Sequence, residues 1–213
     1  MLGIPTGQMQ KVMLGESVHT FGRWASWLWL LLLVAGCSDP IPVPKPRGYF
    51  RIDLPERSLR GVSSGCGPTF ELPQYAGCAT ATRGEEPGFC GFNIVFPGFE
   101  AVIHCTYVAM DGSGEMLEAL VGDAHDLAFN HDVKATGIGR QLFDFPGLHV
   151  HGLLYDLEGP VATPLQFFAT DSVEHFVRGS LYFNHEPNPD SLAPALSHVR
   201  ADLVHVIETL DWP

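Results

Sequence analysis

A short apolar run near the N-terminus determines where the folded part of this chain can begin. Trp24–Ala35 contains no charged residue and follows the basic Arg23. The run is shorter than the about 20 apolar residues that a helix needs to cross a bilayer. A short apolar run behind a basic residue is typical of an export signal that is removed from the mature protein. We therefore expect the fold to be encoded downstream of this run.

The end of the run predicts a lipid anchor. Val34-Ala35-Gly36-Cys37 matches the bacterial lipobox, in which small residues admit the signal peptidase and the cysteine thiol carries the lipid. We predict that residues 1–36 are cleaved and that Cys37 is lipidated. The acyl chains would then hold the protein at a membrane of the cell envelope, facing the periplasm or at the outer surface. The alternative is an ordinary secretory signal in which Cys37 is incidental.

A proline-rich segment separates the anchor from the rest of the chain. Residues 38–48 contain four prolines, and proline favours an extended polyproline-like backbone. We interpret residues 37–48 as the lipidated cysteine followed by a stiff tether. The remaining residues 49–213 have the length of a single globular domain.

Composition restricts the partners of this domain. The sequence has 24 acidic residues against 12 Lys and Arg, a net charge of −12 at pH 7. Binding to nucleic acid requires a basic surface, so we expect no nucleic-acid partner. Attraction to an acidic membrane surface is disfavoured for the same reason. The 46% of hydrophobic residues suffices for a core, while 17 prolines and 23 glycines disfavour long helical bundles.

Cysteine usage predicts structural disulfides. An exported protein folds in an oxidising compartment, where an even number of cysteines indicates disulfide bonds. No C-x-x-C pair is present, which disfavours a zinc site and thioredoxin-like redox chemistry. Three pairings are open for the cysteines beyond the tether, which are Cys66, Cys78, Cys90 and Cys105.

Several segments have the alternation or composition of strands. Residues 92–96 and 101–109 are separated by Pro97-Gly98, a turn signal, and therefore predict a hairpin. We expect the Gly- and Cys-rich residues 61–91 to be largely irregular. The other expected strands are residues 49–54, 69–72, 137–145, 148–157, 161–170 and 174–184.

Two segments have the period of amphipathic helices. Apolar residues recur every three or four positions from Met116 to Ala128 and again from Leu192 to Leu210. Ser113 or Asp111 would cap the first helix, and the second would be capped at Asp190 or Ser191. The pattern predicts an α+β fold in which a mainly antiparallel sheet is flanked by two amphipathic helices.

Two sets of residues are candidates for metal binding. His149 and His151 would project from the same face of a strand, but two ligands alone do not make a site. His198, Asp202 and His205 lie along one flank of the final helix, where they would ligate zinc or form a solvated helix border. We expect no metal and no other cofactor.

One segment contains the residue types of a nucleophile relay. Asp171-Ser172 is followed closely by Glu174-His175, but adjacent strand residues point to opposite faces, which is poor geometry for Ser–His activation. No serine lies in a G-x-S-x-G elbow. The more plausible role of this segment is a turn in which Asp and Ser side chains satisfy backbone donors. We expect no enzymatic activity.

Motifs along the whole mature chain resemble the gliding motility lipoprotein GldD family. The N-terminal motif is Pro44-Lys-Pro-Arg-Gly-Tyr-Phe-Arg-Ile-Asp-Leu-Pro55. Further matches are Ile103-His104 with Tyr107, Thr170-Asp-Ser172 with His175-Phe176, Gly179, Leu181-Tyr-Phe183, Asn188, Asp190-Ser-Leu-Ala-Pro194 and the ending Ile207-Glu-Thr209 with Trp212. The order of elements is also similar to the PsbP/Mog1-type α/β/α sandwich.

The resemblance implies a non-enzymatic envelope lipoprotein that acts as a scaffold. Its partners would be other envelope proteins of the gliding motility and type IX secretion machinery, and its membrane contact would be the lipid. The matched segments would define the fold or dock a partner through Arg47, Tyr49, Arg51, Asp53, Thr170, Asp171, Ser172, His175, Arg178 and Tyr182. The alternatives are a periplasmic ligand- or metal-binding lipoprotein that uses a sheet pocket and a histidine pair and, third, a hydrolase using Ser172 and His175.

Overall fold

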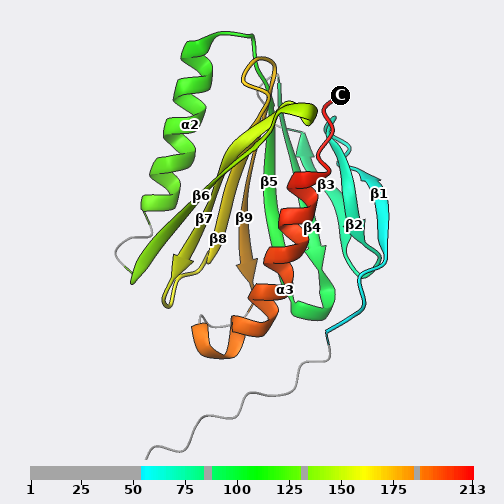
Figure 1. Cartoon of the computed structure of the whole chain (residues 1–213), viewed down its shortest axis with the longest axis vertical. Coiled ribbons are helices and arrows are strands. Elements are labelled where there is room, and N and C mark those ends of the chain that lie inside the picture. Colours follow the sequence, from blue (N-terminus) through cyan, green and yellow to red (C-terminus); the bar gives the residue numbers. More distant parts are fainter. Residues whose placement is uncertain (1–53, 84–87, 131–133, 185–187) are drawn as a thin grey trace, which may run out of the picture. The chain divides into compact units, whose positions relative to one another are not determined.

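The computed structural model describes residues 54–83, 88–130, 134–184 and 188–213, all within one compact unit that spans Tyr49–Pro213. The expected signal, the tether and residues 49–53 lie outside the described residues. The described residues form a large twisted sheet, a separate two-stranded sheet and two long helices, in the arrangement of Figure 1. The predicted α+β fold with a mainly antiparallel sheet and two helices is confirmed.

The large sheet has seven strands, and every pairing within it is antiparallel. In spatial order it contains β3 (Gly77–Arg83), β4 (Phe89–Phe96), β5 (Ala101–Ala109), β9 (His175–Phe183), β8 (Leu165–Thr170), β7 (Val150–Glu158) and β6 (Gly137–Phe145). The small sheet pairs β1 (Leu59–Ser63) with β2 (Thr69–Pro73). The strand expected at 69–72 forms as β2. The rest of residues 61–91, expected to be largely irregular, contains β3 and parts of β1 and β4, which is a correction to the prediction from composition.

Two hairpins are closed by the same kind of turn. The expected hairpin around Pro97-Gly98 forms through the short 3₁₀ turn η1 (Pro97–Phe99). A second turn of this kind, η2 (Pro146–Leu148), joins β6 to β7. Each turn ends in a residue with left-handed backbone, Glu100 at φ 47° and His149 at φ 52°. Proline supplies the first turn residue because its ring fixes φ near the helical value.

The two halves of the sheet meet where β5 pairs with β9. In this register Cys105 lies opposite Gly179, and Phe167 of β8 lies on the other side of the same glycine. A Cβ atom at Gly179 would lie 2.4 Å from the Phe167 ring and 3.1 Å from the Cys105 sulfur. Glycine is therefore required at this position, because any side chain would collide with the core.

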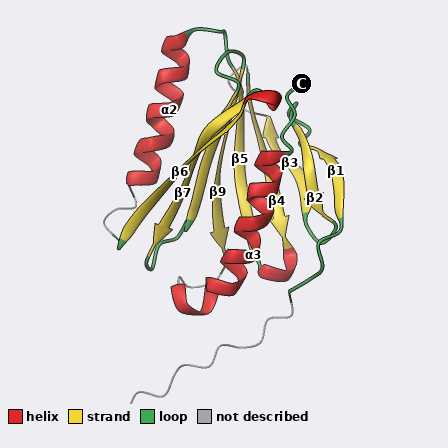
Figure 2. Ribbon diagram, in the orientation of Figure 1, coloured by secondary structure: helices red, strands yellow, loops and turns green. Residues whose placement is uncertain are grey.

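Helix α3 (Pro189–Glu208) packs on one face of the large sheet (Figure 2). Its buried residues join Ile103, Phe167 and Leu181 of the sheet, with Phe70 and Leu72 of β2, in one core cluster. The side chain of Asn188 caps the helix by accepting from the Ser191 N–H. The cap thus lies earlier than the expected Asp190 or Ser191, because the helix begins with Pro189, whose missing N–H costs nothing at that position.

Helix α2 (Gly114–Phe129) packs on the opposite face. Side chains alternate between the two faces of a strand, so the neighbours of the α3-facing residues point toward α2. Phe168 and Phe176 are two such residues, and they form a second core cluster with Ala124 and Ala128 of α2. Ser113 caps α2 through its side chain, which confirms one of the two expected caps. The sheet therefore lies between two helices in three layers.

Helix α2 covers only part of its face of the sheet. It packs on β8 and β9, and its His125 and Phe129 also contact Tyr155 of β7 and Arg140 of β6. The same face of β3, β4, β5 and the end of β9 stays accessible. Ala79, His104 and Tyr182 are exposed there, and the residues between them are half-buried. We define the open face as Ala79, Asn93, His104, Thr106, Arg178, Ser180 and Tyr182.

The predicted disulfides form in part. Cys66 and Cys90 are bonded and join the loop after β1 to β4. Cys78 and Cys105 are free thiols, so the expectation that all four cysteines pair is wrong for these two. Burial raises the pKa of both thiols above the ordinary cysteine value, which disfavours the reactive thiolate form. These two cysteines serve as sheet residues packed against the core.

Replacing both Cys66 and Cys90 with serine should lower the free energy of unfolding by about 3 kcal/mol, because the bond closes a loop with a sequence separation of 24 residues. Urea denaturation followed by circular dichroism measures the change. Cys78→Ser is the matched control and should change stability by less than about 1 kcal/mol. A loss below 1 kcal/mol for the double variant would show that the disulfide contributes little.

Candidate functional site

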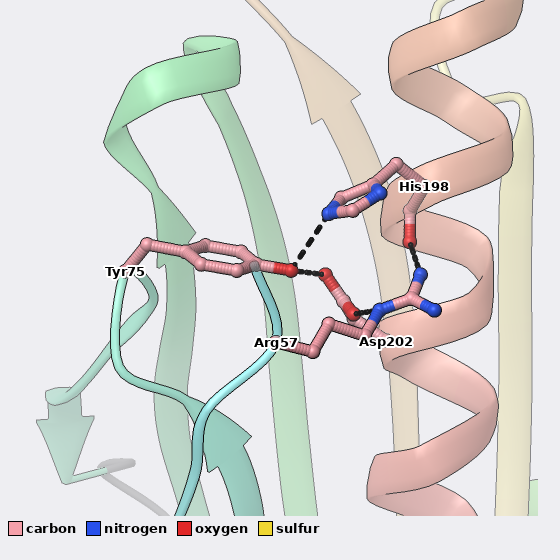
Figure 3. Close-up of polar contacts among 4 residues, drawn as sticks. All are labelled: Arg57, Tyr75, His198 and Asp202. Carbon is pink, nitrogen blue, oxygen red and sulfur yellow. Dashed lines mark hydrogen bonds and ion pairs between the residues drawn. The ribbon is translucent and has the colours of Figure 1, made fainter. Parts of the chain in front are cut away.

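Four polar side chains from three separate segments meet on the buried side of α3 (Figure 3). Asp202, with 1% of its side chain exposed, accepts from Arg57 Nε at 2.7 Å and from the Tyr75 hydroxyl at 2.5 Å. The Tyr75 hydroxyl also lies 2.9 Å from His198 Nε2, and Arg57 Nη2 donates to the His198 carbonyl at 3.1 Å. We call these four residues the Asp202 network.

The proton positions in this network follow from its geometry. Tyr75 has one hydroxyl proton and donates it to Asp202, so its oxygen accepts from His198, which places the His198 proton on Nε2. Burial and donation to Asp202 raise the pKa of Tyr75 well above its ordinary value. Tyr75 therefore keeps its proton and donates it to Asp202. The network joins the segment before β1 and the loop after β2 to α3.

The expected metal-binding flank of α3 is used in the same way. His198 and Asp202 belong to the network, and His205 Nε2 lies 2.9 Å from the Glu71 carboxylate of β2. Within the ranges that the structure describes, no group of three metal-binding side chains occurs. These residues attach the small sheet to the helix instead.

The expected histidine pair does not share a strand face. His149 lies in the turn before β7, with left-handed backbone, and its carbonyl accepts from Trp212 Nε1. His151 lies within β7 and its Nδ1 contacts the Asp144 carboxylate at 2.7 Å. The prediction was wrong because His149 caps the end of the η2 turn and β7 begins only at Val150. His149 therefore does not take part in the alternation of side chains along the strand.

The Asp171 turn is held by side-chain acceptors, as the sequence indicated. Asp171 Oδ1 accepts from the backbone N–H groups of Val173, Glu174 and His175. Burial alone would raise the pKa of Asp171, but these three donors and the His175 charge outweigh it, and the pKa lies below its ordinary value of 3.8. The second acceptor is Thr170 rather than the expected Ser172, since Ser172 N donates to Thr170 Oγ1.

His175 is held away from any serine. Its Nδ1 lies 2.8 Å from the Tyr107 hydroxyl, and its ring stacks on Trp212 at a centroid distance of 5.4 Å. Ser172 is exposed, with φ at 68°, and among the described contacts no hydrogen bond joins its side chain to His175. The geometry offers no support for the hydrolase alternative.

The remaining residues expected to dock a partner separate into two groups. Arg178 and Tyr182 lie on the open face, where Tyr182 packs on His104 at a ring-centroid distance of 5.6 Å. His104 Nδ1 in turn contacts Asn93 Oδ1 at 2.8 Å. Arg47, Tyr49, Arg51 and Asp53 lie outside the described residues.

A cavity of about 590 Å³ lies beside the first half of α3. Its wall is mainly apolar, and Arg200 at its edge forms an ion pair with Asp156 at 2.8 Å and a hydrogen bond with Gln141 at 2.9 Å. The apolar lining residues include Leu157, Val161, Pro164, Phe183, Leu192 and Leu196. The sequence predicted a pocket on the sheet but not the residues that line it. The wall of this cavity comes from four segments that are separate in the sequence.

A family model described as gliding motility lipoprotein GldD matches residues 39–212. The chain belongs to this family. The GldD family assignment makes it a lipoprotein associated with gliding motility and held at the cell envelope by lipid, and it confirms the resemblance found in the sequence motifs. None of the helices in the described residues has the length and apolar character needed to cross a membrane.

Other comparisons add one structural neighbour of this GldD family member. The solution structure of cyanobacterial PsbP from Synechocystis is similar, with 12% sequence identity and a TM-score of 0.45, over 79% of this chain and 100% of that chain. No curated protein matches the sequence significantly.

Sequence reasoning missed Arg57 and Tyr75 of the Asp202 network. Both lie in segments without regular period, and Asp202 is separated from Arg57 by 145 positions. One signal was present, because Asp202 lies three residues after Val199 and directly before Leu203, on the apolar stripe of α3. An acidic residue on a buried stripe requires donors from another element.

Asp202→Asn should lower the free energy of unfolding by about 2–4 kcal/mol, because the buried amide has one acceptor oxygen for the two donors Arg57 and Tyr75 and turns its own N–H groups toward the other donor. Urea denaturation measures the loss. Asp144→Asn is the matched control, since Asp144 is 61% exposed in its contact with His151 and should contribute less than about 1 kcal/mol. Equal effects of the two substitutions would contradict a structural role of the network.

Asp171→Asn should be destabilising at pH 7, and the difference from the unsubstituted protein should shrink in acid. Because the folded pKa of Asp171 lies below 3.8, its charge stabilises the fold fully well above that pH and loses its effect as the pH falls through the folded value. Urea denaturation between pH 7 and pH 3 tests this. A difference that stays constant over the range would show that the charge of Asp171 has no part in holding the turn.

Proposed function

We propose that this chain is a non-enzymatic scaffold of the gliding motility and type IX secretion machinery, which docks a partner protein on the open face. The predicted lipid at Cys37 would hold the domain at a membrane, and the proline-rich tether would set its reach. The docked partner would be another envelope protein of the machinery.

The observation that carries this proposal is the uneven cover of the sheet. One face of the sheet is packed by α3 and β2, while on the other face α2 packs on the half formed by β6 to β9 and leaves β3, β4 and most of β5 accessible. The open face has small and polar side chains, with a single charged residue, Arg178. A broad surface with few charges and exposed aromatic and histidine side chains has the composition of a protein interface.

The polar clusters support a non-enzymatic role. The Asp202 network places its acid and its histidine in contact with a tyrosine that stays protonated. His175 contacts the rings of Tyr107 and Trp212, and among the described contacts no serine or cysteine side chain lies beside it. Each cluster thus connects separate segments of the fold, as expected for a rigid docking module.

Ala79→Arg should disrupt docking, because it places a long charged side chain on the exposed β3 part of the open face. Full-length protein is crosslinked mildly in membranes of a gliding host and purified, and the associated proteins are identified by mass spectrometry. We expect loss of gliding or type IX secretion components and reduced motility, with unchanged thermal stability.

Ala201→Arg on the exposed side of α3 is the matched control and should keep both the partners and motility. If Ala79→Arg also retains them, the open face is not the docking surface. If the unsubstituted protein recovers no component of the machinery, the scaffold role itself fails.

The cavity beside α3 supports a second candidate function, the binding of a small apolar ligand. Its volume of about 590 Å³ lies in the range of pockets that hold small molecules. Mass spectrometry of an organic extract of the purified full-length protein tests this. A stoichiometric small molecule together with an absence of protein partners would favour ligand binding over the scaffold.

A further inference from the structure

Arg178 lies in a shallow groove of about 370 Å³ on the open face, between the sheet and α2. The β5–β9 register places Thr106 beside Arg178 and His104 beside Ser180 on this face. Tyr182 borders the groove from the end of β9, and Leu127 of α2, 42% exposed, forms an apolar wall.

Within the described part of the chain, no side chain or carbonyl accepts from the Arg178 guanidinium. Among the arginines whose side chains the structure describes, it is the one for which no hydrogen bond, ion pair or ring contact exists. Arg57 and Arg200 bind carboxylates, Arg60 donates to the Ala76 carbonyl, and Arg140 lies over the Phe129 ring. An unpaired, half-buried arginine is unexpected in a chain with 24 acidic and 12 basic residues.

The groups around Arg178 are suited to an anion. Thr106, Ser180 and Tyr182 contribute hydroxyl donors to the groove. Of the residues that the structure describes, no carboxylate lines the groove. A guanidinium fork without an acceptor recognises a planar carboxylate through two parallel hydrogen bonds.

Charge and shape favour a carboxylate over a phosphate. The single positive charge of Arg178 balances the single negative charge of a carboxylate. A phosphate monoester carries close to two negative charges at pH 7, so one of them would stay unbalanced in a protein whose net charge is already −12. The apolar Leu127 wall would contact the methylene groups of an acidic side chain. We propose that this groove binds a carboxylate, presented by an aspartate or glutamate of the docked partner. The inference rests on the proposed docking function.

Titration of the full-length protein in detergent tests the ligand chemistry. The probe is N-acetylglutamate α-amide, with inorganic phosphate at equal ionic strength as the comparison, and the Arg178 Nε–H resonance is followed by NMR. We expect a saturable shift at Arg178, none at Arg140, and at least tenfold weaker binding to Arg178→Gln, read from the Thr106 and Ser180 amides. Absence of saturation, or phosphate binding at least as tight, would overturn the proposal.

A second experiment identifies the source of the carboxylate. Arg178→Lys introduces an amine that a carbodiimide joins to a carboxylate bound in the groove, and Arg140→Lys outside the groove is the matched control. We expect a linkage from position 178 to an Asp or Glu of another envelope protein, mapped by mass spectrometry of membranes. A linkage only to small carboxylates, or equal linkage from position 140, would overturn a protein source.

The two proposals fail in different ways. If Ala79→Arg abolishes recovery of the partners while Arg178→Gln leaves it unchanged, docking on the open face stands and the carboxylate inference is wrong. If neither substitution has an effect but the small probe binds, the groove is a site for a free carboxylate and the docking function fails.

Discussion

The pairing of β5 with β9 is the constraint on which the rest of the structure depends. It joins the β3–β4–β5 half of the sheet to the β6–β9 half, which are connected in sequence only through α2. Gly179 permits this pairing, because Phe167 and Cys105 occupy the space where its side chain would lie. Once the two halves are joined, one continuous face is available to α3 and the other is divided between α2 and the open face.

The two helices stabilise this sheet in different ways. Helix α2 contributes an apolar stripe that packs on β8 and β9, and it also contacts β7 and β6 through His125 and Phe129. Helix α3 adds polar attachments, because Asp202 and His205 bind residues before β1 and within β2. Burying Asp202 costs free energy, and the donors from Arg57 and Tyr75 offset that cost. The small sheet is therefore held at a defined position, which leaves the far side of the large sheet as the accessible surface.

The histidines and cysteines show why residue type alone does not identify a site. His149 and His151 have the spacing of a strand pair, but a left-handed turn residue interrupts the alternation. Four cysteines suggested two disulfides, yet only Cys66 and Cys90 are bonded, while Cys78 and Cys105 are packed in the sheet as thiols. His149 belongs to a turn and His151 to a strand, and the cysteine pairing depends on how the loop after β1 packs against β4, which no residue count encodes.

The sequence by itself determined the features that depend on local pattern. The helical stripes of α2 and α3, the Pro97-Gly98 hairpin, the Asp171 turn and the family motifs could all be recognised, because each is encoded within a short stretch of chain. Only the tertiary structure decided the strand order, the Asp202 network, the choice of disulfide and the isolation of Arg178 on the open face. These depend on residues far apart in sequence, whose proximity arises when the β5–β9 pairing forms and the helices pack on opposite faces.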